Sequence, residues 1–493
     1  MSGFEILTAE SAAPVAGKRE KIRHEQYADA FLMDMAKEEE LRLCFHAGRF
    51  LRYDGTHYVP EQEVDRRLRT YLLNKKIPQN NTMVGNVVPI IQARTLVRLD
   101  RHPELPFWKT DDPPCESRNI VAFRNGLVDI EEAIRGGAVV MPHTPKWVSL
   151  QFFPHDYDIA AGCPRWMGFL ERTFEGDKER VALLQEWFGY CLTADNSLQK
   201  MLCLKGVSRG GKGTVVSVLE AYLGSENVTG FSLDSLTTQF GMSGLVGKLV
   251  ATIGEVNLQR NPHKFTIYQN LDMLVGNDLV EIEYKYNPIK TSTRLPVRFV
   301  MCCNAMPNFA DDSGALAERL MILDFERAVP PEERDPSLPG KLIAEVSGIT
   351  NWAIEGLARL RANGRFTVPA KMAATVNAYR RENSKTLAFL QDRAVINRSL
   401  DTGNLPGVDV VSGDVGQVYC DDLKKSYLRW CEDSFVVDSG EGHFFKNLNQ
   451  VLPKLVRRQK ADPFGTKRWA YLGLRLKEEV VDDDDGWTTG LPT

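Results

Sequence analysis

A glycine-rich segment with a single lysine is the clearest candidate for chemistry in this sequence. It has the G-x-x-x-x-G-K spacing of a phosphate-binding loop and consists of Gly206, Val207, Ser208, Arg209, Gly210, Gly211, Lys212, Gly213 and Thr214. Glycines let successive backbone N–H groups turn toward phosphate oxygens, and the lysine reaches the β- and γ-phosphates. Residues 201–205 predict a strand before the loop, and residues 214–222 predict a helix whose N-terminus favours an anion. The segment therefore predicts ATP as the ligand.

The residue after the lysine departs from the usual pattern of this loop. A serine or threonine normally follows directly and binds Mg²⁺, whereas here Gly213 follows and Thr214 comes one position later. We expect Thr214 to reach the metal directly or through a water. The alternative is a glycine-rich turn that binds nothing, and the flanking strand and helix disfavour it.

Two further apolar runs end in side chains suited to nucleotide hydrolysis. Residues 248–254 lead into Glu255, and residues 298–303 lead into Asn304. Ligands collect at the carboxyl ends of parallel strands, so both side chains are expected beside the loop. There Glu255 would hold Mg²⁺ or polarise the attacking water, and Asn304 would orient that water. Taken singly, Glu255 could be a solvated strand end and Asn304 a turn residue.

Arg319 is the candidate for a group that stabilises charge during phosphoryl transfer. It ends the segment GALAER, which predicts a short helix over residues 314–319. An arginine donated by a neighbouring subunit can neutralise the charge that develops on the transferred group. Taken alone, the residue fits a surface salt bridge better.

These side chains require a sheet that brings several strand ends together. The predicted strands are separated by helical segments, which indicates a parallel α/β core. Outside this core, residues 124–130 predict a turn and a short strand, residues 341–362 predict a helix, and residues 444–458 predict a basic helix. We divide the chain into a flexible leader (1–25), a mixed α/β N-terminal domain (26–160), a helical connector (161–198), an ATPase core (199–335), a helical segment (336–384), a small C-terminal domain (385–478) and an acidic tail (479–493).

The composition is typical of a globular protein and shows no overall basic charge. The chain has 493 residues, of which 43% are hydrophobic and 26% charged, as in ordinary globular proteins. A net charge of −4 means that any DNA contact must come from a local basic surface. The nine cysteines include no C-x-x-C pair, which disfavours zinc and suits free thiols in a reducing compartment. We expect no membrane span and no secretory signal, and therefore a location in the cytosol of a bacterial host.

With these residues in place, the sequence resembles the helicase part of the phage and plasmid primase–helicase family, a superfamily 3 branch of the AAA+ ATPases. The resemblance runs over residues 125–380. Besides the loop and the acidic strand, it rests on NGLVD (125–129), CPRW (163–166), FG (240–241), LVGK (245–248), GND (276–278), NAMP (304–307), DDSGALAER (311–319) and GITNWAIEGL (348–357). Asn277 replaces one glycine of the family's Gly-Gly-Asp segment.

The resemblance implies a hexameric ring that hydrolyses ATP with Mg²⁺ and moves 3′ to 5′ along single-stranded DNA. It implies Lys212 at the phosphates, Glu255 on the acidic strand, Asn304 as the sensor and Arg319 as a finger that reaches a neighbouring subunit.

A DNA-binding hairpin in the pore is also implied, and here it corresponds to residues 283–290. Asn287-Pro288 predicts its turn, flanked by cations and aromatics that suit single-stranded DNA. Lys285 is the first candidate contact and Lys290 the second, while Tyr284 stands where relatives often have a basic residue. A surface hairpin with solvated lysines is the alternative.

The N-terminal and C-terminal regions indicate their functions less clearly than the ATPase core does. Residues 26–160 resemble the region ahead of the helicase, so we expect no primase catalytic domain and allow for a separate primase or polymerase partner. The family suggests a winged-helix-like C-terminal domain, whose basic cluster would hold duplex DNA near an origin. The cluster consists of Lys446, Lys454, Arg457, Arg458, Lys460, Lys467 and Arg468. A solvated helix face is the alternative.

Two other functions share parts of this pattern. An origin-binding or loader ATPase would use the nucleotide as a switch and would bind DNA without processive unwinding. A nucleotide kinase shares the Gly-Lys-Gly-Thr sequence, but kinases carry the loop near the start of the chain. We therefore expect a replicative DNA helicase first and a switch ATPase second.

Overall fold

The computed structural model describes residues 16–36, 40–98, 100–102, 104–255, 258, 261–284, 287–309, 315–401, 405, 407–434 and 441–477. The chain forms two compact units. The first contains residues 1–255, 273–304 and 325–368, and the second contains residues 256–272, 305–324 and 369–493.

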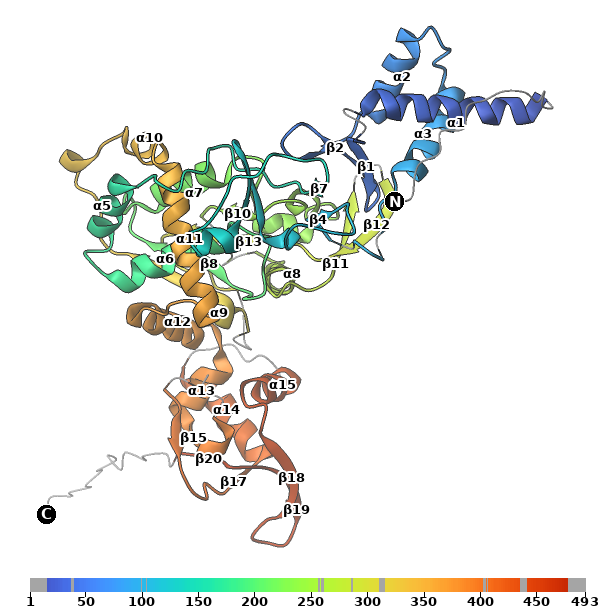
Figure 1. Ribbon diagram of the computed structural model, residues 1–493. Helices are drawn as coiled ribbons and strands as arrows, with labels where there is room; N and C mark the ends of the chain where they lie inside the picture. Colours follow the sequence, from blue (N-terminus) through green and yellow to red (C-terminus); the bar gives the residue numbers. More distant parts are fainter. Residues whose placement is uncertain are drawn as a thin grey trace, which may run out of the picture. The chain divides into compact units, whose positions relative to one another are not determined.

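The first unit starts with a small α/β region that has its own core (Figure 1). An antiparallel sheet packs with three helices, and the elements are α1 (Ala16–Met35), β1 (Leu43–His46), β2 (Arg49–Tyr53), β3 (Tyr58–Glu61), α2 (Val64–Asn74) and α3 (Asn81–Thr95). Phe31, Leu68 and Ile91 from the three helices are buried against Leu43 and Phe50 of the sheet. Helix α1 begins at Ala16, inside the segment expected to be a flexible leader.

Two short antiparallel strand pairs connect this region to the central sheet. They are β4 (Phe107–Trp108) with β7 (Trp147–Val148), and β5 (Ile120–Phe123) with β6 (Gly126–Asp129), which leads into α4 (Ile130–Ile134). The turn and strand predicted within residues 124–130 are confirmed, because Gly126 opens β6.

The central feature of the chain is a five-stranded sheet with the order β14-β8-β13-β10-β9. Its strands are β8 (Met201–Gly206), β9 (Val228–Gly230), β10 (Val250–Ile253), β13 (Arg298–Cys303) and β14 (Leu320–Phe325). Strands β8, β13, β10 and β9 pair in parallel, which confirms the predicted parallel α/β architecture. The apolar runs of β8, β10 and β13 are buried almost throughout, as is usual for parallel strands covered on both faces, whereas the short β9 is partly exposed.

Helices of the first unit accompany this sheet (Figure 1). They are α5 (Pro164–Thr173), α6 (Lys178–Tyr190), α7 (Lys212–Leu223), α10 (Leu338–Ile343) and α11 (Val346–Asn363), and α8 (Lys264–Val275) ends in this unit. The single helix expected over residues 341–362 is divided, because Ala344 and Glu345 form a turn between α10 and α11.

Helices α6 and α11 are joined by a buried polar network as well as by apolar packing. The Glu186 carboxylate is fully buried and accepts hydrogen bonds from Arg359 Nε, Thr367 N and Thr367 Oγ1, each at 2.7 Å. Three donors satisfy the carboxylate, so its charge is tolerated in the interior.

A two-stranded hairpin leaves the core between α8 and β13. Strand β11 (Val280–Tyr284) pairs with β12 (Asn287–Thr293), and Tyr284 lies opposite Asn287. The turn predicted at Asn287-Pro288 is therefore wrong, because both residues belong to β12.

The second unit contains the short helix α9 (Ala315–Arg319), helix α12 (Ala370–Asn383) and a C-terminal domain. That domain comprises α13 (Lys385–Arg393), β15 (Ala394–Asn397), β16 (Asp409–Val411), β17 (Gln417–Tyr419), α14 (Cys420–Asp433), α15 (Glu441–Val451), β18 (Val456–Ala461), β19 (Lys467–Leu472) and β20 (Leu474–Leu476). Its two sheets have the orders β16-β15-β20 and β17-β19-β18.

The helix expected over residues 444–458 ends early, and its basic end is a strand instead. Helix α15 ends at Val451 and Pro453 follows, which has no N–H with which to continue a helix. Arg457 and Arg458 therefore lie on β18, where every residue is exposed.

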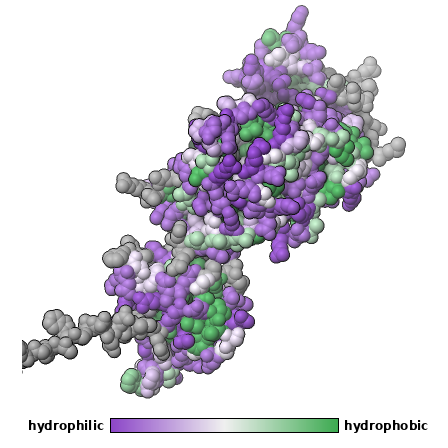
Figure 2. Space-filling view, turned by 90° about the vertical axis from the view of Figure 1, so that its left-hand side faces the viewer, coloured by the Kyte–Doolittle hydropathy of each residue, from purple (hydrophilic) through white to green (hydrophobic). Residues whose placement is uncertain are grey.

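On the face in Figure 2, apolar residues form separate patches among hydrophilic ones. All nine cysteines are free and seven are buried. In the described parts of the chain, no helix has the length and apolar character to cross a membrane.

Three buried histidines predict that the first unit loses stability in mild acid. Burial lowers the pKa of His46, His57 and His155 below the ordinary 6.5. Below that value the unfolded chain binds protons that the folded chain does not, so stability present at neutral pH is lost as the pH falls. We expect the midpoint of thermal unfolding to drop between about pH 7 and pH 5. The drop should be smaller in His155→Gln, and an equal drop in both proteins would contradict this assignment.

Candidate nucleotide site

The candidate phosphate loop, residues 206–214, joins the end of β8 to the start of α7. Gly206, Arg209 and Gly211 have φ angles of 145°, 65° and 102°, all in the left-handed region that favours glycine, and two of the three residues are glycines. A Cβ on Gly206 would overlap the Phe325 carbonyl, and the Val207 N–H donates to Phe325 O at 3.0 Å. The end of β14 therefore packs directly against the loop and helps to fix its conformation.

Lys212 lies at the first position of α7, and its ammonium group turns back over the loop. Nζ donates to Gly206 O at 2.5 Å, to Val207 O at 2.8 Å and to Asn304 Oδ1 at 3.1 Å. An ammonium group in this place satisfies loop carbonyls and can exchange them for phosphate oxygens. The ammonium group thus lies beside the loop, and its contact with phosphate stays a prediction.

Asn304 and Glu255 lie together beside Lys212. Asn304 Nδ2 donates to Glu255 Oε1 at 3.1 Å, while its Oδ1 accepts from Lys212. Strand β13 lies between β8 and β10, so the amide that follows it bridges the residues that follow its two neighbours. Both Asn304 and Glu255 are exposed, so their polar groups are accessible to a ligand and to water.

The same arrangement fits the requirements of a magnesium nucleotide. Mg²⁺ is usually held by one or two carboxylates, substrate phosphates and waters. Glu255 supplies one carboxylate, and Thr214 lies in the first turn of α7. No group of three or more His, Cys, Asp or Glu side chains that could hold a metal occurs within the described residues. Glu255 and Thr214 are the residues of this site that could hold the metal.

Arg319 lies in the second unit, at the end of α9. Its Nη1 donates to the Asp272 carbonyl at 2.8 Å and also contacts the Asp272 carboxylate. Both side chains are about three-quarters buried, with exposed fractions of 24% and 23%. To act as a finger, Arg319 would have to exchange Asp272 for a phosphate group.

The candidate DNA contacts lie on the hairpin between β11 and β12. Lys285 is outside the described residues. For Tyr284 and Lys290 the structure describes only the backbone, which places them in β11 and β12.

Two supports of the site were not predicted. One is β14, whose last residue, Phe325, contacts Gly206 as described above; the other is a hydrogen bond of 3.3 Å from Thr252 Oγ1 on β10 to Glu220 Oε1 on α7. The apolar run LMILDF that follows Arg319 was a detectable sign of β14.

Comparisons with known families match two parts of the chain. Residues 29–175 match the model "D5 N terminal like", and residues 204–319 match "Family of unknown function (DUF5906)". Three solved structures of the NrS-1 C-terminal region also align, over 91% of this chain and 98–100% of theirs. They are 10–11% identical, with TM-scores of 0.44–0.47. The D5 match supports the resemblance to phage and plasmid primase–helicases, and the second match spans all four candidate catalytic residues.

Proposed function

We propose that this protein is an ATP-driven translocase that moves along single-stranded DNA as a ring, in the manner of a replicative helicase. The observation that carries the proposal is the hydrogen-bonded series Lys212–Asn304–Glu255 beside the phosphate loop. It places a cation, an orienting amide and a carboxylate within one site, and these are the groups that phosphoryl transfer to water requires.

Each residue has a role that follows from its position. Lys212 exchanges its loop carbonyls for the β- and γ-phosphates of ATP. Asn304 orients a water toward the γ-phosphate, and Glu255 polarises that water. A bound Mg²⁺, held by Glu255 and Thr214, would neutralise charge on the phosphate oxygens.

Arg319 provides a test of ring assembly, because a finger acts across a subunit interface. We expect Arg319→Ala to bind ATP almost normally and to lose most hydrolysis. Mixing it with Glu255→Gln subunits should restore part of the rate, since some interfaces then combine an intact Glu255 with an intact Arg319.

Asp272→Asn is the matched control for that experiment. It removes the carboxylate that pairs with Arg319 but keeps the arginine. Hydrolysis should persist if Arg319 acts on phosphate. An equal loss in both variants, with no recovery on mixing, would reduce Arg319 to a structural ion-pair partner.

The C-terminal domain supports a second DNA contact, on the hairpin formed by β18 and β19. Arg458, Lys460 and Arg468 share one face of it, by the pairing of Lys460 with Arg468. Phe464 at the tip is 94% exposed, and Trp469 is 47% exposed beneath the Arg457 guanidinium. Lysines and arginines on an edge strand can prevent it from pairing with another chain. An exposed aromatic side chain would favour such association, so protection of the edge does not explain Phe464. Arg458 and Lys460, with Phe464 at the tip, suit duplex DNA, where cations bind phosphates and an apolar wedge contacts bases. Trp469 lies on the opposite face, and Arg468 is ion-paired with Asp422 at 3.1 Å.

We expect the double substitution Arg458→Gln and Lys460→Gln to weaken duplex DNA binding and to lower its salt dependence. The slope of log K against log salt should fall by about one for each lost phosphate contact. Arg475→Gln, an exposed arginine on the other sheet of this domain, is the control. The slopes are measured by fluorescence anisotropy titration at several salt concentrations. If the double variant had the same slope as the wild-type protein, these residues would not contact DNA.

A further inference from the structure

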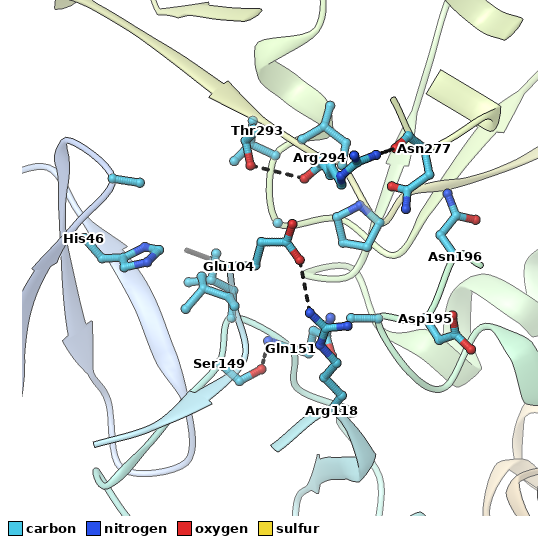
Figure 3. Close-up of a pocket in the computed structure, with 18 of the residues that line it drawn as sticks. His46, Glu104, Arg118, Ser149, Gln151, Asp195, Asn196, Asn277, Thr293 and Arg294 are labelled. Carbon is cyan, nitrogen blue, oxygen red and sulfur yellow. Dashed lines mark hydrogen bonds and ion pairs between the residues drawn. The ribbon is translucent and has the colours of Figure 1, made fainter. Parts of the chain in front are cut away.

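The first unit contains a polar cleft and a larger polar groove, and their cations differ in what they contact. In the cleft, of about 220 Å³, Figure 3 shows Arg118 paired with Glu104, and Arg294 hydrogen-bonded to Asn277. Every arginine that lines this cleft has a partner within the protein. Its cations are therefore already engaged, and the groove is the better candidate for an anionic ligand.

The groove has a volume of about 780 Å³ and lies in the N-terminal region, where α1, β2 and α2 line it. Its lining includes Asp34 on α1, Arg42 ahead of β1, Tyr53 at the end of β2, Tyr71 on α2 and Lys75 directly after α2. These helices and strands share one hydrophobic core, which fixes their positions around the groove.

Helix α2 gives one side of the groove a positive charge. Residues 64–76 contain five lysines and arginines and a single acidic residue, whereas the whole chain has a net charge of −4. The apolar residues Val64, Leu68 and Leu72 of this helix are buried, so its basic side chains lie on the remaining faces. A protein with a negative net charge needs a local basic surface of this kind to bind nucleic acid.

Two cations of the groove lie against aromatic rings. Arg42 Cζ is 5.5 Å from the ring centroid of Tyr53, and Lys75 Nζ is 5.7 Å from that of Tyr71. Neither cationic side chain forms a hydrogen bond or an ion pair with another residue in the described parts of the chain. A ring face attracts a cation but does not neutralise its charge. Both cations are therefore available to an anion.

The three other arginines of the lining are already paired. Arg52 and Arg67 share the Glu61 carboxylate, at 2.9 Å and 2.6 Å respectively. Arg66 pairs with Glu63 at 3.0 Å. The two cations held against rings are therefore the ones that a ligand would meet without first breaking an ion pair.

One carboxylate of the groove also lacks a cation. Asp34 is exposed on α1, and no ion pair or hydrogen bond joins its side chain to another residue that the structure describes. Burial, and then the Asp34 carboxylate, raise the pKa of Tyr71 above its ordinary value of 10, so Asp34 lies near the ring that holds Lys75. A ligand that uses all of these groups must offer anions together with an N–H or O–H donor.

We propose that this groove binds a short stretch of single-stranded nucleic acid, with phosphates at Arg42 and Lys75 and a base N–H at Asp34. Phosphates supply the anions, and unpaired bases expose N–H groups that a carboxylate can accept. The volume lies within the range of about 300–1,000 Å³ that is typical of ligand sites, which suits a few units of an unpaired strand. An acidic peptide would also bind the two cations, but its carboxylates would be repelled by Asp34.

The inference goes beyond the proposed translocase, because the groove requires neither ATP nor a ring. It gives the N-terminal region a contact with the strand that does not depend on the bound nucleotide. Binding in the absence of nucleotide is therefore the property to measure.

The test measures binding of a fluorescent single-stranded oligonucleotide to the full-length protein without nucleotide, by anisotropy over a series of salt concentrations. Arg42→Gln and Lys75→Gln should each weaken binding roughly tenfold, the loss expected for one charge-assisted contact. Each should lower the salt slope by about 0.7, and Lys75→Arg should retain the wild-type slope. Arg135→Gln, an exposed arginine paired with Glu132, is the control and should change neither. Wild-type affinity and slope in both glutamine variants would overturn the proposal.

Asp34→Ala separates a nucleic-acid strand from an acidic peptide. It should weaken binding of the oligonucleotide, because it removes the acceptor for a base N–H. It should strengthen binding of poly-glutamate, because it removes a like charge. Tighter binding of the oligonucleotide by this variant would mean that Asp34 only repels the strand, and would overturn the assignment.

The outcome for the groove is separate from the outcome for the translocase. A wild-type protein that binds no single strand without nucleotide, but whose ATP turnover responds to DNA, would overturn the groove alone. Binding that depends on Arg42 and Lys75, in a protein whose turnover does not respond to DNA, would support the groove and contradict the translocase.

Discussion

Replacing Lys212 with alanine should lower the rate of ATP hydrolysis at least about a hundredfold while the protein stays folded. The ammonium group is the cation that contacts the phosphate loop directly, with two loop carbonyls and Asn304 as its partners. Its removal takes away the positive charge that would face the β- and γ-phosphates. Lys212 is partly exposed, so water can satisfy the carbonyls that it leaves. Steady-state ATPase rates and thermal unfolding would measure the two effects.

Lys248→Ala is the matched control for that variant. Lys248 also donates to two backbone carbonyls, Glu226 O at 2.8 Å and Ser225 O at 3.5 Å, but it precedes β10 rather than following β8. It should keep near-normal hydrolysis. If Lys212→Ala hydrolysed ATP at a rate within a few-fold of wild type, the loop would not be the nucleotide site.

Replacing Gly189 with alanine should destabilise the first unit by about 3 kcal/mol or more. Gly189 lies in α6 where this helix meets α11. A Cβ there would overlap the Ala353 carbonyl and come within 2.7 Å of Leu357 N. Both are backbone atoms of α11 and cannot rotate away, so the two helices would have to separate. Differential scanning calorimetry should show a clearly lower unfolding temperature.

Gly168→Ala tests whether this effect comes from packing and not from glycine itself. Gly168 is also inside a helix, α5, but the nearest atom to its added Cβ is Arg172 Nη1 at 3.6 Å. Alanine favours the helix by up to about 1 kcal/mol, so this variant should be neutral or more stable. Equal destabilisation by both substitutions would contradict the close approach of α6 and α11.

The strands of the site could be predicted because the buried residues and the candidate catalytic residues are adjacent in the sequence. Strands β8, β10 and β13 are apolar runs of suitable length, and each leads into a polar residue or a glycine. The strand order was not predictable from these runs. That order decides that Asn304 lies between Lys212 and Glu255, since β13 is the shared neighbour of β8 and β10.

Other elements were missed for local physical reasons. Strand β9 has three residues, too few for a periodic pattern, and its pairing with β10 defines it. Helix α15 was predicted too long because its apolar spacing continues past Pro453, where the missing N–H ends the helix. Asn287-Pro288 has the composition of a turn, but cross-strand pairing with Tyr284 places Asn287 in a strand.

The most direct test of the central claim is the rate of ATP hydrolysis as single-stranded DNA is added, on protein sized by light scattering with and without a nonhydrolysable ATP analogue. A translocase should form a ring that the nucleotide stabilises, and DNA should raise its turnover several-fold. A monomer whose turnover does not respond to DNA would contradict the account and would favour an ATPase that uses the nucleotide as a switch.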